Sequence, residues 1–270
     1  MPIASGLVSW RLVAYLEIRG VKKAFGKKRV FSNVDLSIRR GETLSIIGPS
    51  GCGKSVLLKM IVGLLEPDEG QIVFDDEDVT AGGEEAFVRL RRRVAMLFQG
   101  AALFDSLTVF ENVAYGLREQ RKLDEDQIRA RVAESLAYVG LPGIEEMWPA
   151  ALSGGMRKRV GLARSIASHP EVMLYDEPTT GLDPVNVERI NRLIRHLAAQ
   201  LSLTSIVVTH DFATVRSVSD RVAMLDQGAV RFVGTYDELA RCPDDRVRAF
   251  VNGDPSFDAA IEETFGRKNA

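Results

Sequence analysis

Apolar and polar residues alternate near the start of this chain of 270 residues, at positions 15–21 and 32–38. The two runs flank a Phe-Gly-Lys-Lys sequence at 25–28, which is typical of a turn. An alternation of period two indicates strands with one buried face, so this region is predicted to be an antiparallel pair.

Short, mostly apolar runs then alternate with longer runs of helical periodicity. Helices are predicted at residues 54–65 and 128–139, and after Asp183 and Pro184, where a capping residue precedes a proline. Pro67 and Gly70 are expected to end the first of these helices. Continuous apolar strands separated by helices are typical of a buried parallel sheet, so the predicted fold class is α/β. Strands are predicted at residues 43–47, 71–74, 94–98, 172–175 and 205–209, a hairpin at 221–233, and a capping box at 235–238.

Composition excludes several classes of protein. The 35 basic and 37 acidic residues give a formal net charge of −2, so no broad basic field indicates a nucleic-acid partner. No apolar run reaches the ~18 residues that a membrane-spanning helix requires. Residues 1–16 lack the basic start and the cleavage site of a secretory signal. Cys52 and Cys242 are too few for a disulfide framework, which indicates a reducing compartment.

A phosphate-binding loop is indicated where the strand at 43–47 meets the first helix. Residues 48–55 read Gly-Pro-Ser-Gly-Cys-Gly-Lys-Ser and fit the pattern G-x-x-x-x-G-K-[ST]. Glycines let the backbone wrap closely around phosphates, and the helix presents its positive end to them. The lysine is expected to reach the β- and γ-phosphates, and the serine hydroxyl suits Mg²⁺. The predicted nucleotide-binding residues here are Gly48, Pro49, Ser50, Gly51, Cys52, Gly53, Lys54, Ser55 and Val56.

An acidic pair follows the apolar strand at 172–175. Asp176 is placed to bind the hydration shell of Mg²⁺ and belongs to the predicted nucleotide site. Glu177 is placed to orient or deprotonate the water that attacks in a phosphoryl transfer.

A second anion site is indicated in the Leu-Ser-Gly-Gly-Met run at 152–156. Ser153 is expected to cap a helix whose first turn carries Gly154 and Gly155. The hydroxyl and the free N–H groups of this turn favour an anion, but the site has no cation of its own.

Together these runs resemble the ATP-binding-cassette (ABC) ATPases, and the resemblance covers residues 16–240. It implies a P-loop ABC domain with a parallel-sheet core, a small antiparallel β subdomain and an inserted helical subdomain. The domain is expected at residues 15–242, with the helical subdomain at about 84–168. Residues 1–14 and 243–270 are expected to be extensions.

The resemblance also assigns roles to single residues. His210, at the end of a Val-Val-Thr-His run, resembles the switch histidine that contacts the γ-phosphate. Gln99 resembles the Q-loop glutamine, which contacts Mg²⁺ and links the nucleotide to the helical subdomain. Phe25 resembles the aromatic residue that stacks on adenine. The predicted catalytic residues are Glu177, His210, Gln99 and Lys54, and the predicted metal-binding residues are Ser55, Gln99 and Asp176.

In this family the Leu-Ser-Gly-Gly run contacts the nucleotide that the other subunit holds. The resemblance therefore implies a homodimer that sandwiches two ATP molecules. Each ATP would lie between the phosphate loop of one chain and Ser153, Gly154 and Gly155 of the other. The Gly-Leu-Asp run at 181–183 resembles the D-loop, which crosses the dimer interface.

Three stretches resemble the ATPases of Mla/MCE-type lipid transporters, namely residues 53–59, 96–113 and 152–159. In the last of these, Met156 replaces the commoner glutamine. This resemblance implies that the chain powers phospholipid or other lipid transport between membranes of a bacterial envelope. It would act as a peripheral protein at the cytoplasmic face of the inner membrane. The implied partners are an integral permease, docking near Leu103, Phe104 and Phe110, an MCE-domain lipid-binding protein and, as an open possibility, a small regulatory subunit.

Two alternative functions stay open. An ABC importer ATPase for amino acids or other small solutes carries the same motifs, usually with glutamine at the position of Met156. A non-transport ABC ATPase, such as a scaffold or an assembly factor, is an alternative of a different class. The single cassette without a long heptad insertion argues against fused translation factors and DNA-repair clamps.

Overall fold

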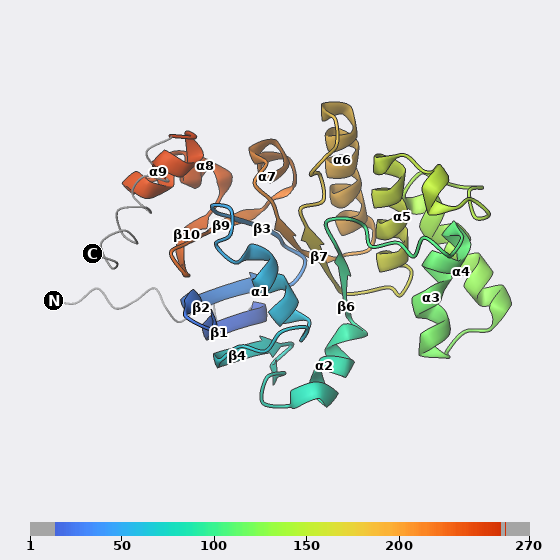
Figure 1. Ribbon diagram of the computed structural model, residues 1–270, viewed down its shortest axis with the longest axis horizontal. Coiled ribbons are helices and arrows are strands. Elements are labelled where there is room, and N and C mark those ends of the chain that lie inside the picture. Colours follow the sequence, from blue (N-terminus) through green and yellow to red (C-terminus); the bar gives the residue numbers. More distant parts are fainter. Residues whose placement is uncertain (1–13, 255–256, 258–270) are drawn as a thin grey trace.

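The computed structural model describes residues 14–254 and residue 257. Figure 1 shows a broad sheet with helices on both faces and the helices α3, α4 and α5 grouped at one end. The described strands are β1 (Ala14–Phe25), β2 (Lys28–Arg39), β3 (Thr43–Ile47), β4 (Glu69–Phe74), β5 (Glu77–Asp78), β6 (Val94–Leu97), β7 (Val172–Asp176), β8 (Thr204–Val208), β9 (Arg221–Asp226) and β10 (Ala229–Gly234). The described helices are α1 (Lys54–Ile61), α2 (Gly83–Arg91), α3 (Val109–Gln120), α4 (Glu125–Tyr138), η2 (Pro149–Ala151), α5 (Gly154–Ile166), α6 (Pro184–Gln200), α7 (Phe212–Val218), α8 (Tyr236–Ala240) and α9 (Asp245–Val251).

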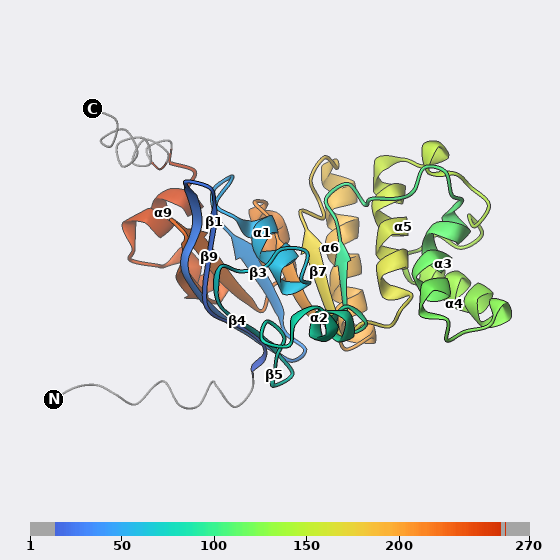
Figure 2. The same ribbon diagram turned by 60° about the horizontal axis from the view of Figure 1, so that its bottom comes forward.

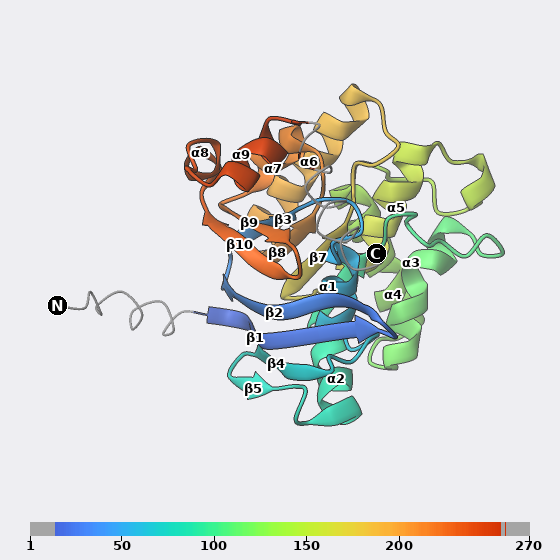
Figure 3. The same ribbon diagram turned by 60° about the vertical axis from the view of Figure 1, so that its left-hand side comes forward.

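The strands form one mixed sheet in the order β5-β4-β1-β2-β10-β9-β3-β8-β7-β6. From β9 to β6 the neighbouring strands are parallel, whereas β1 is antiparallel to both β2 and β4. Figure 3 shows β1, β2 and β4 side by side at one margin of the molecule. The predicted antiparallel pair at 15–21 and 32–38 and the predicted hairpin at 221–233 are therefore confirmed.

The parallel strands are buried on both faces because their side chains alternate. Val172 and Leu174 of β7 lie in one apolar cluster with α1, whereas Met173 and Tyr175 of the same strand lie in another with α6. A strand that is covered on both sides has no solvated face, so its sequence is apolar throughout. This is the physical reason that the run before Asp176 predicted an interior strand.

Helix α2 packs with the sheet core. The sequence had instead placed it in the helical subdomain, which was expected to begin at about residue 84. Its Ala86, Phe87 and Leu90 are buried in the cluster that also contains residues of α1, β1 and β2. The following strand β6 belongs to the main sheet. The apolar faces of α3, α4 and α5 share a separate cluster with α6. The pattern of apolar and polar positions does not reveal which surface the buried face of a helix contacts.

Helix α1 ends at Ile61, earlier than its predicted end at residue 65. Gly63 has φ +69°, its N–H donates to the carbonyl of Met60 at 3.0 Å, and the N–H of Leu64 donates to the carbonyl of Lys59 at 2.8 Å. A left-handed glycine with this pair of bonds is a Schellman cap. The cap terminates the helix before Pro67 is reached.

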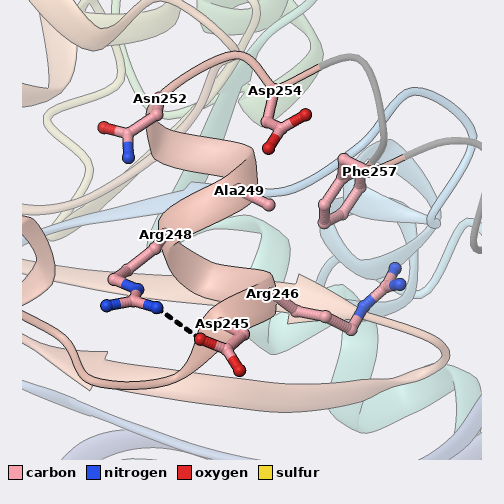
Figure 4. A pocket seen from close by; sticks show the side chains of 7 residues that line it. All are labelled: Asp245, Arg246, Arg248, Ala249, Asn252, Asp254 and Phe257. Carbon is pink, nitrogen blue, oxygen red and sulfur yellow. Dashed lines mark hydrogen bonds and ion pairs between the residues drawn. The ribbon is translucent and has the colours of Figure 1, made fainter.

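Part of the predicted C-terminal extension at 243–270 packs on the sheet. Helix α9 buries Val247 in a cluster with residues of β9 and α7. Arg246 of α9 donates to the carboxylate of Asp226 from Nε at 2.7 Å and from Nη2 at 3.0 Å. A pocket of about 490 Å³ lies beside α9, and Figure 4 shows Phe257 among the side chains that line it. None of the predicted nucleotide-binding residues lines this pocket.

The remaining parts of the predicted extensions lie outside the described residues. These parts are residues 1–13, 255–256 and 258–270. Ala14, which was assigned to the N-terminal extension, is the first residue of β1. Within the described part of the chain, no helix has the length and apolar character needed to cross a membrane.

Candidate nucleotide-binding and catalytic site

The loop between β3 and α1 has a conformation that requires glycine at two positions. Gly48 has φ +149°, and a Cβ atom there would lie 2.2 Å from the carbonyl oxygen of Leu225. Gly53 has φ +105°, and its Cβ would lie 2.7 Å from the ring of Phe31. Gly53 is also the N-cap of α1, and no side chain caps this helix. The first N–H groups of α1 therefore have no side-chain cap and are available to bind an anion at the loop.

Lys54 is the first residue of α1 and is almost fully buried. Its Nζ donates to the carbonyl oxygens of Gly48 at 2.8 Å and of Pro49 at 3.1 Å. These bonds hold a positive charge against the loop, where it favours phosphate binding. Ser50 and Gly51 lie at the turn of the loop, and burial raises the pKa of the Cys52 thiol, which disfavours a thiolate there.

Ser55 and Asp176 come together from α1 and β7. The Ser55 hydroxyl donates to Oδ1 of Asp176 at 2.7 Å. Burial raises the pKa of the Asp176 carboxyl, although the bond from Ser55 acts in the opposite direction. A hydroxyl and a carboxylate are oxygen ligands of the kind that Mg²⁺ prefers, and a cation would offset the cost of burying the charge of Asp176. The pair therefore fits an Mg²⁺ ion that takes its other ligands from phosphates and water.

Glu177 is held in an uncommon backbone conformation beside Asp176. Its φ is +49°, and its N–H donates to the carbonyl of Val208 at 2.9 Å. Oε2 of its carboxylate accepts a bond from the Thr180 hydroxyl at 2.9 Å and lies 2.9 Å from Nδ1 of His210. The Glu177 side chain is 12% exposed and that of His210 is 63% exposed. The carboxylate is therefore sheltered and oriented, while the imidazole faces solvent.

Parallel pairing brings three predicted residues to one edge of the sheet. Strands β6 and β8 both pair with β7 in parallel, so the residues that follow these strands emerge together. These residues are Gln99, Glu177 and His210, and Gln99 is exposed there. Phe25 lies apart from them at the β1–β2 turn, where its ring is 47% exposed with Lys23 Nζ 5.5 Å from the ring centroid.

Ser153 begins α5, as predicted, and its hydroxyl accepts a bond from the N–H of Met156 at 3.2 Å. Ser153 and Gly154 are exposed, whereas Gly155 is buried close to Asn186 of α6. Figures 1 and 2 show α5 on the far side of β7 and α6 from α1. Within one chain, the structure therefore does not bring the α5 N-terminus to the phosphate loop.

Two residues that contact Glu177 were not identified from the sequence. One is Thr180, which lies three residues after Glu177 in a tight turn. This short spacing is a sequence signal that could have identified the contact. The other is Lys158 of α5, whose Nζ donates to the carbonyl oxygen of Glu177 at 3.2 Å. Lys158 carries no comparable sequence signal, because its contact joins segments that are distant along the chain.

The predicted docking segment contains both exposed and packed aromatic residues. Phe104 is 44% exposed, and its ring lies 5.0 Å from that of Tyr115 on α3. Leu103 and Phe110 are partly buried against the cluster of the helical subdomain. The buried side chain of Asn112 fixes the loop, since Oδ1 accepts from the N–H of Phe104 at 2.8 Å and Nδ2 donates to its carbonyl at 3.1 Å.

Comparison with known proteins agrees with this geometry. A family model described as ABC transporter matches residues 31–180. The chain is 41% identical over 238 residues to the probable ribonucleotide transport ATP-binding protein mkl of Mycobacterium tuberculosis, covering 88% of this chain and 66% of that protein. It is 39% identical over 238 residues to the intermembrane phospholipid transport system ATP-binding protein MlaF of Escherichia coli K12, covering 88% of each chain.

Solved structures with similar folds are ATP-binding cassettes. The dimeric post-hydrolysis structure of the cassette MJ0796 bound to ADP and Pi has a TM-score of 0.75 and 32% identity, covering 82% of this chain and 98% of that one. The structure of cbiO1 from Clostridium perfringens, part of the ABC transporter complex cbiONQ, has a TM-score of 0.78 and 29% identity, covering 93% of this chain and 99% of that one.

Proposed function

This chain belongs to the ABC transporter family and is an ATPase, and we propose that it powers phospholipid transport between the membranes of a bacterial envelope. The observation that carries the proposal is the 39% identity to MlaF over 88% of both chains. The resemblance of residues 96–113 to lipid-transport ATPases supports the same cargo.

The nucleotide site is built to bind and orient the phosphates of ATP. We assign phosphate binding to the loop at 48–55, where N–H groups and the Lys54 ammonium surround a concentrated negative charge. Ser55 and Asp176 would hold Mg²⁺, with Gln99 nearby at the same edge of the sheet. When bound, that ion supplies charge neutralisation on the phosphate oxygens.

Glu177 is the group that orients the attacking water. Its two contacts with described side chains, Thr180 and His210, are both made by Oε2. Oε1 can then accept a hydrogen bond from water, which Glu177 positions for in-line attack on the γ-phosphate. His210 keeps the carboxylate in place and, on its exposed side, can reach the γ-phosphate.

Hydrolysis takes place in a homodimer with composite sites. The exposed Ser153–Gly154 turn lies away from the phosphate loop of its own chain, so an ATP phosphate can reach it only from another subunit. Similar cassettes are dimeric in solved structures, which supports this arrangement. Phe25 is assigned to the adenine, on which its exposed ring can stack.

The other proposed partners are those implied by the resemblance to lipid-transport ATPases. An integral permease would dock on Leu103, Phe104 and Phe110, an MCE-domain protein would carry the lipid, and a small regulatory subunit is included as a further partner. The chain would work at the cytoplasmic face of the inner membrane. The exposed Phe104 is the feature of the described surface that best supports permease docking.

Ribonucleotides are a second candidate cargo, because mkl, which is 41% identical to this chain, is named for ribonucleotide transport. The deciding experiment uses the full chain copurified with its membrane partners and reconstituted in vesicles. We expect ATP-dependent movement of fluorescent phospholipid between vesicles and no ATP-dependent uptake of labelled ribonucleotide. Uptake of ribonucleotide without lipid movement would replace the proposed cargo, and copurification with ribosomes instead of an integral membrane protein would contradict transport itself.

A further inference from the structure

Helix α5 joins two functional regions of the same chain. Its N-terminus carries the Ser153 anion site, and Lys158 in its second turn contacts the catalytic turn after β7. The Lys158 side chain is nearly inaccessible, at 8% exposed, and its Nζ donates to the carbonyl oxygen of Glu177 at 3.2 Å. The same carbonyl accepts a bond from the N–H of Thr180 at 3.3 Å.

A buried ammonium group is costly unless its contacts are specific. Burial lowers the pKa of Lys158, and the negative charge of Glu177 acts in the opposite direction. The cation is thus held in a partly desolvated position whose hydrogen-bond acceptor is a main-chain carbonyl. That carbonyl belongs to a residue with φ +49°, a conformation that persists only where its surroundings fix it.

The hydrogen bond from Lys158 to the Glu177 carbonyl affects the orientation of the Glu177 carboxylate. The peptide group after Glu177 is fixed by Lys158 on one side, and the carboxylate is fixed by Thr180 and His210 on the other. A helix is rigid over two turns, so a displacement of the α5 N-terminus moves Lys158 with it. A shift of the Glu177 peptide would then change the direction of Oε1 toward water.

We propose that Lys158 is a positioning residue that couples the two nucleotide sites of the dimer. The phosphate of the ATP held by the partner binds at Ser153–Gly155, and α5 transmits the resulting displacement through Lys158 to Glu177 of its own chain. Each catalytic carboxylate therefore responds to the occupancy of the other site. This inference rests on the proposed function, since it requires an ATPase dimer with composite sites.

The test compares three full-length variants with the unmodified chain by steady-state ATPase measurements over a range of ATP concentrations. Lys158→Met removes the donor and the charge but keeps the length of the side chain. We expect kcat to fall about 10- to 100-fold, because small misplacements of a catalytic group have effects of this size. We expect the Hill coefficient for ATP to fall toward one, with ATP binding unchanged. Lys158→Arg keeps a cationic donor and is expected to restore cooperativity in large part.

Arg159→Met is the matched control. Arg159 lies next to Lys158 on α5 and donates to the carbonyls of Val139 and Gly140, each at 3.3 Å, away from the catalytic turn. It is expected to leave both kcat and the Hill coefficient unchanged. Thermal melting of each variant separates loss of fold from loss of coupling, and Lys158→Gln replaces Lys158→Met if the latter does not fold.

The ATPase measurements distinguish failure of the Lys158 coupling role from failure of the proposed ATPase function. Unchanged cooperativity and kcat in the folded Lys158→Met chain would overturn the coupling role while leaving the ATPase assignment intact. Hyperbolic ATP dependence of the unmodified chain would also contradict coupling. An unmodified dimer that does not hydrolyse ATP would instead contradict the proposed function.

Discussion

At the scale of single residues, Glu177 is the group proposed to orient the attacking water. Its carboxylate is sheltered, and among the described residues Thr180 and His210 contact it through the same oxygen. The N–H groups of the phosphate loop and the Lys54 ammonium are assigned to bind phosphate, but as donors they do not supply a negatively charged oxygen for water. The loss of this one charge should therefore separate binding from turnover.

Glu177→Gln is predicted to keep ATP binding while turnover falls by ~10²-fold or more, a range typical for loss of acid–base assistance. The ATP-bound dimer should accumulate and be detectable by size-exclusion chromatography with ATP. Glu188→Gln makes the same chemical change on α6, where Glu188 pairs with Arg192 at 2.7 Å on the surface, and should not alter turnover. A Glu177→Gln complex with near-normal ATPase activity would remove the assigned role.

At the scale of secondary-structure elements, a polar network joins the strand ends opposite the nucleotide site. Arg93, just before β6, donates from Nε to Glu171, just before β7, at 2.5 Å. Its Nη2 donates to Asp75 after β4 at 2.6 Å, and the Tyr15 hydroxyl of β1 also donates to Glu171. The hydrogen bonds from Arg93 hold the pKa of Glu171 at about 2, below its ordinary 4.5, and burial raises the pKa of Tyr15 to about 12. The network ties the antiparallel strands to the parallel core.

This network predicts a dependence of stability on pH. The folded pKa of Glu171 is depressed, so its stabilising contribution is fully present above pH 4.5 and is lost as the pH falls from 4.5 toward about 2. Glu171→Gln should therefore lower the free energy of unfolding at neutral pH, and the difference from the unmodified chain should shrink below pH 4.5. The side chain of Glu171 is 39% exposed, so added salt should reduce the effect.

Urea unfolding at a series of pH values measures this difference. Glu188→Gln again serves as the control, because Glu188 forms an ion pair with Arg192 of the same helix, α6. A difference between Glu171→Gln and the unmodified chain that stays constant from neutral pH to below pH 4.5 would show that the carboxylate charge does not stabilise the strand ends.

At the scale of the whole molecule, the proposed composite sites make catalysis depend on how two chains meet. Ser153→Arg places bulk and positive charge at the N-terminus of α5 and leaves the phosphate loop of the same chain intact. This variant alone is predicted to be inactive, as is Lys54→Ala alone. A mixture of the two is predicted to regain part of the ATPase activity, because the mixed dimer has one site with an intact phosphate loop and an intact Ser153. The activity stays below that of the unmodified chain, because Glu177 of this site lies in the Ser153→Arg chain and lacks the coupling through α5. Full activity of Ser153→Arg by itself would refute composite sites.

The docking of the chain on a membrane partner is also a property of the whole assembly. Phe104→Asp places a charge on an exposed aromatic residue, so it should spare the fold and weaken docking, since a buried unpaired charge is costly in an interface. We expect the variant to be released from detergent-solubilised membranes and to lose lipid movement while still binding ATP. Phe110→Asp is expected to destabilise the subunit as well, because Phe110 packs against the helical cluster.

Val233→Asp is the matched control for docking. Val233 is an exposed apolar residue, at 40%, on β10 and therefore outside the helical subdomain. It should remain on the membrane complex. Retention of Phe104→Asp with normal lipid transport would remove the support for docking at this segment.

Much of the site was predictable because its parts are continuous in sequence. The loop at 48–55, the Asp176–Glu177 pair and the Ser153 cap each combine a strand or helix boundary with the residues that use it. The residues that follow β6, β7 and β8 lie at one edge because these strands are parallel, whereas the sequence assigned Gln99 and His210 through the family resemblance. The helix caps at Ser153, Asp183 and Thr235 were predictable for the same local reason.

The sequence by itself therefore determined many of the strands and helices, the α/β class and the candidate phosphate-binding residues, because these depend on periodicity and on contacts within a few residues. Only the tertiary structure decided that α2 packs with the sheet core and that α9 joins it through Arg246. It alone brought Lys158 to the carbonyl of Glu177. Such contacts join segments far apart along the chain, and a pattern of apolar and polar positions shows that a face is buried without showing what covers it.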